Sequence, residues 1–198
     1  MIPEPKRKLI LMRNIFCVLV LTLALSSSLR TTAVGQSPAK KVIIEDFGAR
    51  VNAYVRLRKD TEDSFTARAP SNDSSEIAAH KIELAGMIVS ARSNARQGDI
   101  FTPKIAAKFR EIIRKTLKGP GTQDVRRTVE DNDPEKPITV RVNMVYPEDH
   151  PFQTTPPTLL GRLPDLPMDM GYRFIGRSFV LIDNKTRLIV DFIPDAIP

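Results

Sequence analysis

Few side chains in this sequence are of the kinds that catalyse reactions or bind metals, and they are scattered along the chain. The stretch YPEDHP places Glu148, Asp149 and His150 in succession. A carboxylate beside an imidazole can bind a divalent metal ion or exchange protons with a substrate. Neighbours in sequence rarely converge on one point, however, and the flanking prolines favour an exposed turn. These residues are a candidate acid–base or metal site, and a plain turn is the alternative.

A second candidate is a pair of arginines in the stretch ARSNARQGD. Arg92 and Arg96 are one helical turn apart if a helix continues through them, and Asp99 follows closely. Two guanidinium groups on one face could bind an anion. Charges of both signs occur together here, so we favour a structural salt-bridge network at the end of a helix over an anion site.

The remaining ionisable candidates favour structural roles. His80 lies between Ile77 and Leu84, on or beside the expected core face of a helix, and a metal site needs several convergent donors. Two carboxylate pairs are also available, but nothing in their spacing places either pair around a substrate. We interpret these pairs, Asp165 with Asp169 and Asp183 with Asp191, as turn formers or as partners of Arg162, Arg173 or Arg177.

The common catalytic and cofactor-binding motifs are absent from the sequence. It contains no Gly-x-Ser-x-Gly, HExxH, EF-hand loop or dinucleotide fingerprint, and Gly119-Pro120-Gly121 lacks the Lys-Ser/Thr of a phosphate loop. We therefore expect no cofactor and no bound metal. A role in binding is more consistent with this sequence than a role in catalysis.

The N-terminal residues have the three-part layout of a secretory signal peptide. Basic residues precede the uncharged run Ile15–Leu25, and small residues then lead to a cleavage site before Gln36. The run is shorter than the ~20 residues that span a bilayer, which favours cleavage over retention as a membrane anchor. We expect residues 1–35 to be removed and the protein to be periplasmic or secreted.

Removal of residues 1–35 changes both the cysteine content and the charge. Cys17 is the only cysteine, so the mature chain would have none and would depend on its hydrophobic core for stability. The whole chain has 30 basic and 23 acidic residues, and 25 and 22 of them lie after residue 35, a net charge of +3. The two signs alternate without a long single-sign run, which argues against nucleic acid as the partner.

Hydrophobic spacing predicts three helices in a single domain over residues 42–198, preceded by a flexible lead-in at 36–41. The first helix begins near Val42, where apolar residues recur at steps of three and four, and gives way to a polar loop from Asp60. The second begins at a cap formed by Asp73 or Ser74 and ends at Gly98. The third begins at Thr102 and Pro103 and ends before Gly119. Ile100 and Phe101, in the connector between the last two, are expected to fill the core.

Strands are expected only after the helices. Residues 119–137 read as a mobile loop, and ITVRVNMVY (138–146) alternates as a half-buried strand does. The Pro-rich segment 147–167 must be extended, with one helical turn at 157–160. Residues 172–182 and 187–193 are then strands joined by a turn at 183–186, with Leu188, Val190 and Phe192 on one face. We predict an α+β fold: three helices on one face of a small antiparallel sheet that ends in a β-hairpin.

Two blocks of the sequence carry a resemblance to other proteins. ARSNARQGDIFTPKIAAKFREII and RLPDLPMDMGYRFIGRSFVLIDNKTRLIVDFIPDAI resemble an uncharacterised group of exported proteins from environmental bacteria. The resemblance extends over most of residues 42–197. It implies a shared fold and export, and it implies no activity.

Together these observations favour an exported, non-enzymatic protein of the cell envelope that binds an unidentified envelope protein or surface. An exposed C-terminal strand could provide such a contact by pairing with another chain. A small metal-dependent or acid–base hydrolase centred on residues 148–150 is the alternative. Contact with the membrane is expected only if the N-terminal segment is retained.

Overall fold

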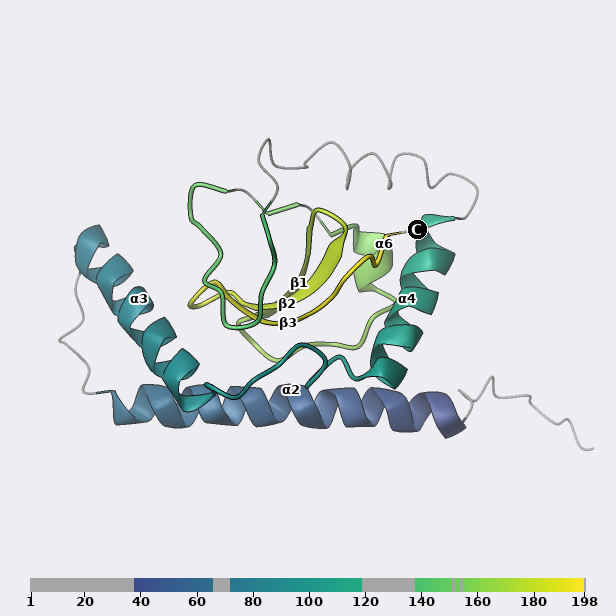
Figure 1. Cartoon of the computed structure of the whole chain (residues 1–198), viewed down its shortest axis with the longest axis horizontal. Coiled ribbons are helices and arrows are strands. Elements are labelled where there is room, and N and C mark those ends of the chain that lie inside the picture. The colour runs from purple at the N-terminus through teal and green to yellow at the C-terminus, as the bar shows by residue number, and fades with distance from the viewer. Residues whose placement is uncertain (1–37, 66–71, 119–137, 151, 154, 198) are drawn as a thin grey trace, which may run out of the picture. The chain divides into compact units, whose positions relative to one another are not determined.

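The computed structural model of the protein describes residues 38–65, 72–118, 138–150, 152–153 and 155–197. The chain divides into two units, residues 1–36 and 37–198, and all described residues belong to the second. In this unit three helices of fifteen or more residues precede a three-stranded antiparallel sheet, so the predicted α+β class is confirmed (Figure 1). The predicted signal peptide (1–35) and mobile loop (119–137) lie outside the described residues.

Helix α2 (Pro38–Ser64) extends further at both ends than the apolar spacing predicts. It begins within the expected lead-in at a proline, whose fixed backbone suits the first helical position. Its last turn continues into the polar stretch, where the hydroxyls of Thr61 and Ser64 donate to carbonyls three or four residues back. Its buried face carries Phe47, Val51, Tyr54 and Arg58 at steps of four, three and four.

Helix α3 (Ser74–Ala91) starts where the sequence predicts. Asp73 caps it by accepting a hydrogen bond of 2.8 Å from the Ser75 amide, and this interaction with Ser75 lowers the pKa of Asp73. The helix ends at Ala91, however, well before Gly98. Gly98 does have the left-handed backbone expected of it (φ +92°), but it lies in the connector to the next helix and is no helix cap.

Helix α4 (Pro103–Leu117) has the predicted first residue and the predicted apolar face. Thr102 precedes it, but the Thr102 side chain makes no capping bond; its carbonyl accepts from the Ala106 amide at 2.7 Å. Ile105, Phe109, Ile113 and Leu117 are all buried. In Figure 1 α2 runs along one side of the sheet, and α3 and α4 rise near opposite ends of α2.

The sheet consists of β1 (Met170–Ile175), β2 (Ser178–Asp183) and β3 (Leu188–Ile193), in that order. The segment 172–182, expected as one strand, is therefore two strands joined by a turn at Gly176, whose positive φ of +54° suits glycine. The turn between β2 and β3 lies at 184–187, one residue beyond the predicted 183–186. The single helical turn α6 (Pro157–Leu160) is also confirmed.

The segment 138–146 is not the strand that its alternation predicts. Asn143 adopts a left-handed backbone (φ +64°), and only Val145 forms a bridge, to Leu188. The segment instead lies along β3, with the Ile189 amide donating to the Met144 carbonyl at 2.8 Å. Its alternating apolar residues cover the second face of the sheet; Ile138, Val140 and Met144 pack against Tyr146, Ile175, Val180, Ile182 and Ile189.

Both edges of the sheet are occupied by other parts of the same chain. Along β3, segment 143–146 donates and accepts backbone bonds, and the Arg92 side chain donates to the Val190 carbonyl at 3.0 Å. Along β1, Gln153 bridges Phe174, and the Thr155 hydroxyl donates to the Tyr172 carbonyl. The expectation of an exposed C-terminal strand is therefore wrong, because its hydrogen-bonding groups are already used.

A β-bulge decides which side chains of β3 face the helices. Leu181 pairs with Asp191 whereas Ile182 pairs with Ile189, which leaves Val190 as the additional residue. The side-chain alternation shifts by one position beyond the bulge. Leu188 and Val190 pack in the core between helices and sheet, as predicted, but Phe192 lies on the opposite face and Asp191 takes its place.

An aromatic cluster fills the space between the helices and the sheet. The ring centroids of Phe47 and Phe109 lie 4.9 Å apart, and those of Tyr172 and Phe179 5.3 Å apart. Ile100 and Phe101 of the connector are buried in the same core, as the sequence predicts. Leu84 and Ile88 of α3 and Leu188 and Val190 of β3 belong to the same core, so all three long helices, the connector and all three strands contribute to one interior.

Candidate functional site

Of the three candidate residues in the 148–150 loop, the structure joins two. His150 Nδ1 lies 2.9 Å from Asp149 Oδ1, and this hydrogen bond lowers the pKa of Asp149. The Asp149 side chain is 80% exposed, and Glu148 is exposed as well. The hollows described below are lined by other residues.

Arg187 holds this loop in place. Its guanidinium donates to the carbonyls of Tyr146, Pro147 and His150 at 3.0, 2.6 and 3.2 Å. It also lies over the rings of Phe152 and Tyr146, with 4.4 and 5.4 Å from the guanidinium carbon to the centroids. The loop is thus fixed through its backbone, and its carboxylates point to solvent.

His80, interpreted as a boundary residue of the second helix, is half-buried on α3. Its ring lies 4.8 Å from the Phe65 ring, centroid to centroid. It therefore packs against the residue that follows α2.

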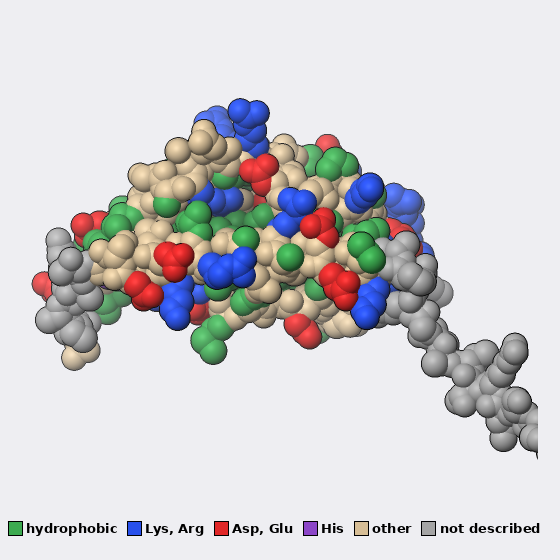
Figure 2. All heavy atoms as spheres, turned by 90° about the horizontal axis from the view of Figure 1, so that it is seen from below, with side chains coloured by type: hydrophobic (Ala, Val, Ile, Leu, Met, Phe, Trp, Pro, Cys, Tyr) green, Lys and Arg blue, Asp and Glu red, His purple; other side chains and the backbone are tan. Residues whose placement is uncertain are grey.

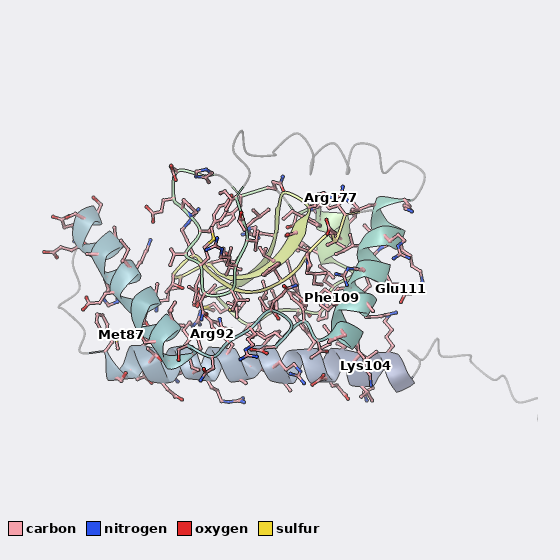
Figure 3. The ribbon with its side chains drawn as sticks, in the orientation of Figure 1. Met87, Arg92, Lys104, Phe109, Glu111 and Arg177 are labelled. Carbon is pink, nitrogen blue, oxygen red and sulfur yellow. The ribbon has the colours of Figure 1, made fainter. Side chains whose placement is uncertain are left out.

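The two arginines of the anion-site candidate are not brought together on a helix, because α3 ends at Ala91. Arg92 turns inward: its Nη2 donates to the Val190 carbonyl, and its guanidinium lies 5.0 Å from the centre of the Tyr54 ring (Figure 3). Arg96 is exposed, and its backbone amide donates to Asp99 Oδ2 at 2.7 Å. The predicted network involves Asp99, but through this amide and not through paired side chains.

Asp183 is a fully buried carboxylate that joins the sheet to α2. Its Oδ2 accepts from the Tyr54 hydroxyl at 2.8 Å, and its Oδ1 accepts from Arg58 at 3.2 Å and from the Lys185 amide at 2.9 Å. Burial, and then the nearby charge of Asp183, raise the pKa of Tyr54, so its hydroxyl stays protonated and donates. The partner of Asp183 is Arg58, and not one of the three arginines that the sequence suggests.

Asp191 is equally buried but is bound by backbone amides. It accepts from Gly98, Ile100 and Phe101 at 3.0, 2.8 and 2.7 Å, and from its own neighbour Phe192 at 2.8 Å. Four donors satisfy a carboxylate without a paired cation. Asp183 and Asp191 therefore hold α2 and the 98–101 connector to the sheet, and they form no acid–base pair.

A shallow groove runs along α2 where α3 and the 92–100 connector meet it. Two adjoining hollows, of about 530 and 500 Å³, share Ala53, Leu57 and Ala91 as lining residues. We call the two together the α2–α3 groove. Its remaining lining residues are Arg50, Tyr54, Arg56, Asp60, Thr61, Ser64, Arg92, Ser93, Asn94, Ala95, Asp99 and Ile100.

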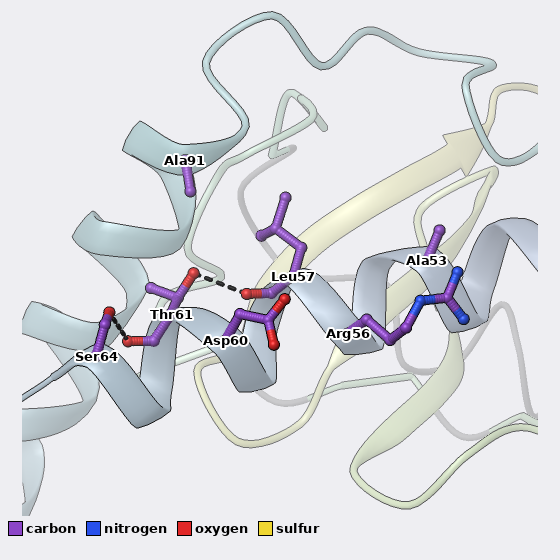
Figure 4. Close-up of a pocket in the computed structure, with 7 residues that line it drawn as sticks. All are labelled: Ala53, Arg56, Leu57, Asp60, Thr61, Ser64 and Ala91. Atoms are coloured by element: carbon purple, nitrogen blue, oxygen red, sulfur yellow. Dashed lines mark hydrogen bonds between the residues drawn. The ribbon is translucent and has the colours of Figure 1, made fainter.

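Figure 4 shows the part of the groove near the end of α2. Ala53 and Ala91 leave room because their side chains are short, and the Leu57 side chain forms an apolar patch between them. The hydroxyls of Thr61 and Ser64 bond back to the helix at 2.7 Å each. Arg56 and Asp60 are exposed at its rim.

Charged groups of the groove differ in how well they are paired. Arg50 donates to Asp46 at 3.0 Å and to the Asp99 carbonyl at 2.7 Å. Arg56 and Arg92, in contrast, have no carboxylate partner among the described residues, and Nη1 of Arg92 is buried without a hydrogen bond there. Burial lowers the pKa of Arg92, yet a guanidinium remains charged at neutral pH. The groove thus offers positive charge beside an apolar patch.

A third hollow, of about 260 Å³, lies where α6 and the Pro-rich segment meet β1, and Leu160, Pro164 and Arg173 are among its lining residues. The Tyr172 hydroxyl crosses to the Pro164 carbonyl at 3.0 Å. Burial raises the pKa of Tyr172, so this hydroxyl too is a donor. The hydrogen bond serves to hold the Pro-rich segment on the sheet.

Comparison with known proteins adds no relative: no family model, no curated protein and no solved structure matches the chain. Within the described ranges, no three His, Cys, Asp or Glu side chains are grouped closely enough to hold a metal ion. None of the helices in the described part of the chain is long and apolar enough to cross a membrane.

The contacts of Tyr54 and Arg58 with a buried carboxylate, and the groove, were not predicted from the sequence. A signal was present, because Tyr54 and Arg58 continue the spacing of Phe47 and Val51 on the buried face of α2. A basic residue at such a position implies a buried acidic partner. That the partner is Asp183, far along the chain, follows only from the tertiary structure.

Proposed function

We propose that this chain is an exported, non-enzymatic binding domain of the cell envelope, which binds a carboxylate-bearing segment of another envelope protein in the α2–α3 groove. The observation that carries this proposal is the pair Arg56 and Arg92, two arginines without carboxylate partners among the described residues, beside the apolar patch of Ala53 and Leu57. An acidic, partly apolar segment is complementary to both features.

The arrangement of the ionisable side chains supports binding over catalysis. The carboxylates of Asp183 and Asp191 accept structural hydrogen bonds. The Arg187 guanidinium holds the 148–150 loop by binding backbone carbonyls of that loop. Export is supported by the signal-peptide layout of residues 1–35. Sequencing the N-terminus of the protein recovered from the envelope tests export, and a start near Gln36 is the expected result.

The groove is tested by filling it. Ala53→Leu adds an exposed apolar side chain within the groove. Arg56→Gln removes one of the two guanidinium groups of the groove that have no carboxylate partner among the described residues. Ala79→Leu is the matched control, since Ala79 is an exposed alanine on α3 that does not line the groove. We expect one envelope protein to crosslink reproducibly to the wild type and to Ala79→Leu, and to be lost with both groove variants.

Two results would refute the groove proposal. One is a crosslinked partner retained by both groove variants at the wild-type level. The other is a set of captured proteins that does not reproduce between preparations. Circular dichroism and thermal melting of each variant must match the wild type, so that loss of folding is not read as loss of binding.

A second candidate function is an acid–base hydrolase at the 148–150 loop, and the 2.9 Å contact between Asp149 and His150 favours it. A carboxylate on Nδ1 orients an imidazole so that Nε2 faces a substrate, as in a general base. Replacing His150 with Ala in a screen of ester, peptide and phosphoester substrates tests this role. Turnover that is abolished supports it, whereas turnover that is unchanged removes it.

A further inference from the structure

The solvent-facing side of α4 is mostly cationic. At 100° per residue, the exposed arc of this helix contains Pro103, Ala107 and Glu111 as its only residues without positive charge. Figure 3 shows Phe109 pointing from α4 towards the sheet and Glu111 on the outer side. The cations of the arc, including the residue that follows the helix, are Lys104, Lys108, Arg110, Arg114, Lys115 and Lys118.

The single carboxylate of the arc does not offset this charge. Glu111 accepts from both Lys108 and Lys115 at 2.7 Å, and these hydrogen bonds lower its pKa to about 2. Lys104, Arg114 and Lys118 are exposed and have no acidic partner among the described residues. The arc therefore presents a net positive charge to solvent across the physiological pH range.

The arc also accounts for the whole positive balance of the chain after residue 35. Residues 104–118 contain six basic residues and one acidic residue, and the rest of 36–198 contains 19 basic and 21 acidic residues. On the α2 side, by contrast, Figure 2 shows acidic and basic side chains interspersed. The charge is thus concentrated on one helix face and is not spread over the surface.

We propose that this face of α4 docks the domain on a bilayer that contains anionic phospholipid. The cations form a line along a helix about 22 Å long, which matches headgroups spread in a plane better than one anion in a pocket. Lysine dominates, as suits diffuse attraction without bidentate recognition. The arc has no aromatic side chain on which a nucleic-acid base could stack. This proposal does not depend on the α2–α3 groove.

The test is co-sedimentation of the full-length chain with vesicles of equal parts phosphatidylglycerol and phosphatidylcholine, and with vesicles of phosphatidylcholine alone. The variant Lys104→Gln/Arg114→Gln/Lys118→Gln neutralises the arc without proline or glycine. Lys41→Gln/Lys59→Gln/Lys81→Gln, all exposed positions on α2 and α3, is the matched control. All three proteins retain residues 1–35, so any insertion of that segment contributes equally.

We expect the wild type and the control to bind the anionic vesicles, and high salt to weaken this binding. Each cation near an anionic surface strengthens binding by about fivefold, so the α4 variant should partition about a hundredfold more weakly. Equal losses in both triple variants, or equal binding of the wild type to both vesicle types, overturn the proposal. So does tighter binding to a DNA duplex than to anionic vesicles at the same salt concentration.

Discussion

The hydroxyl of Tyr54 on α2 donates a 2.8 Å hydrogen bond to the fully buried carboxylate of Asp183, at the end of β2. The two residues are 129 positions apart, and Arg58 shares the same carboxylate. The contact joins the first described helix to the end of the central strand of the sheet. It also explains why α2 carries polar groups on its buried face.

Removing either partner of this contact should destabilise the fold to different degrees. We expect Tyr54→Phe to lower the free energy of unfolding by about 1–2 kcal/mol, because one hydrogen bond to a charged group is lost. Asp183→Ala removes the closer carboxylate partner of the buried Arg58, which keeps only a 3.6 Å contact with the half-exposed Asp169, and should cost about 3–5 kcal/mol. Urea denaturation measures both, and equal losses in the two variants would contradict this assignment.

Asp191 should be important for holding the 98–101 connector against the sheet, because it accepts hydrogen bonds from three of the connector's backbone amides. Asp191→Ala leaves the amides of Gly98, Ile100 and Phe101 without their acceptor, and we expect a loss of more than about 3 kcal/mol. Asp191→Asn keeps one acceptor oxygen and should lose less. Hydrogen exchange of the Ile100 and Phe101 amides gives a local check, since both should exchange faster in each variant.

Acid should weaken the contacts of Glu111 with Lys108 and Lys115. The pH range is set by the pKa of Glu111 in the unfolded and in the folded chain. The pKa of Glu111 falls from 4.5 to about 2 in the fold, so its stabilising contribution is complete above 4.5 and is lost as the pH falls towards 2. The carboxylate is solvent-exposed, so salt should reduce the effect. An NMR titration of the Glu111 side chain measures the pKa directly.

Replacing Lys108 and Lys115 together with Gln should return the pKa of Glu111 towards 4.5. Lys41→Gln, which removes a partner of Glu45 on α2, is the control and should leave the Glu111 titration unchanged. A titration of Glu111 that is the same in all these proteins would show that the two lysines do not hold the carboxylate in solution.

Gly86 within α3 should be replaceable at a gain in stability. A Cβ built on Gly86 meets no atom within 4 Å, and glycine in a helix interior costs about 1 kcal/mol relative to alanine. We therefore expect Gly86→Ala to raise the thermal midpoint. Gly171→Ala is the contrast, because its Cβ would lie 2.9 Å from Asn184 Nδ2, and it should lower the midpoint.

Among the candidate site residues, those with local sequence signals were predicted, and those whose roles depend on distant parts of the chain were not. The sequence singled out Asp149, His150 and Arg92, and the structure gives each a defined contact. It did not single out Tyr54 or the groove residues Ala53 and Leu57, because their roles depend on elements distant in the chain. The basic face of α4 was not predicted from the sequence, since Lys104, Lys108, Lys115 and Lys118 are separated in sequence and lie together only once the helix forms.

By itself, the sequence determined the three long helices, the turn between β2 and β3 to within one residue, the α6 turn and the α+β class. These features depend on local backbone preferences and on the period with which apolar residues recur, and both are contained within a few turns of chain. Burial of Ile100 and Phe101 follows for the same reason, since apolar residues between two amphipathic helices must pack against them.

Only the tertiary structure decided whether 138–146 forms a strand of the sheet and which side chains of β3 face the helices. Alternation states which side chains of 138–146 are buried, but not whether its backbone joins the sheet, and the left-handed Asn143 prevents a continuous ladder. The bulge at Val190 likewise depends on register between strands, and it turns Asp191 towards the amides of the 98–101 connector. Such pairings are set by competition among distant segments for the same hydrogen bonds and the same buried surface, which no local pattern records.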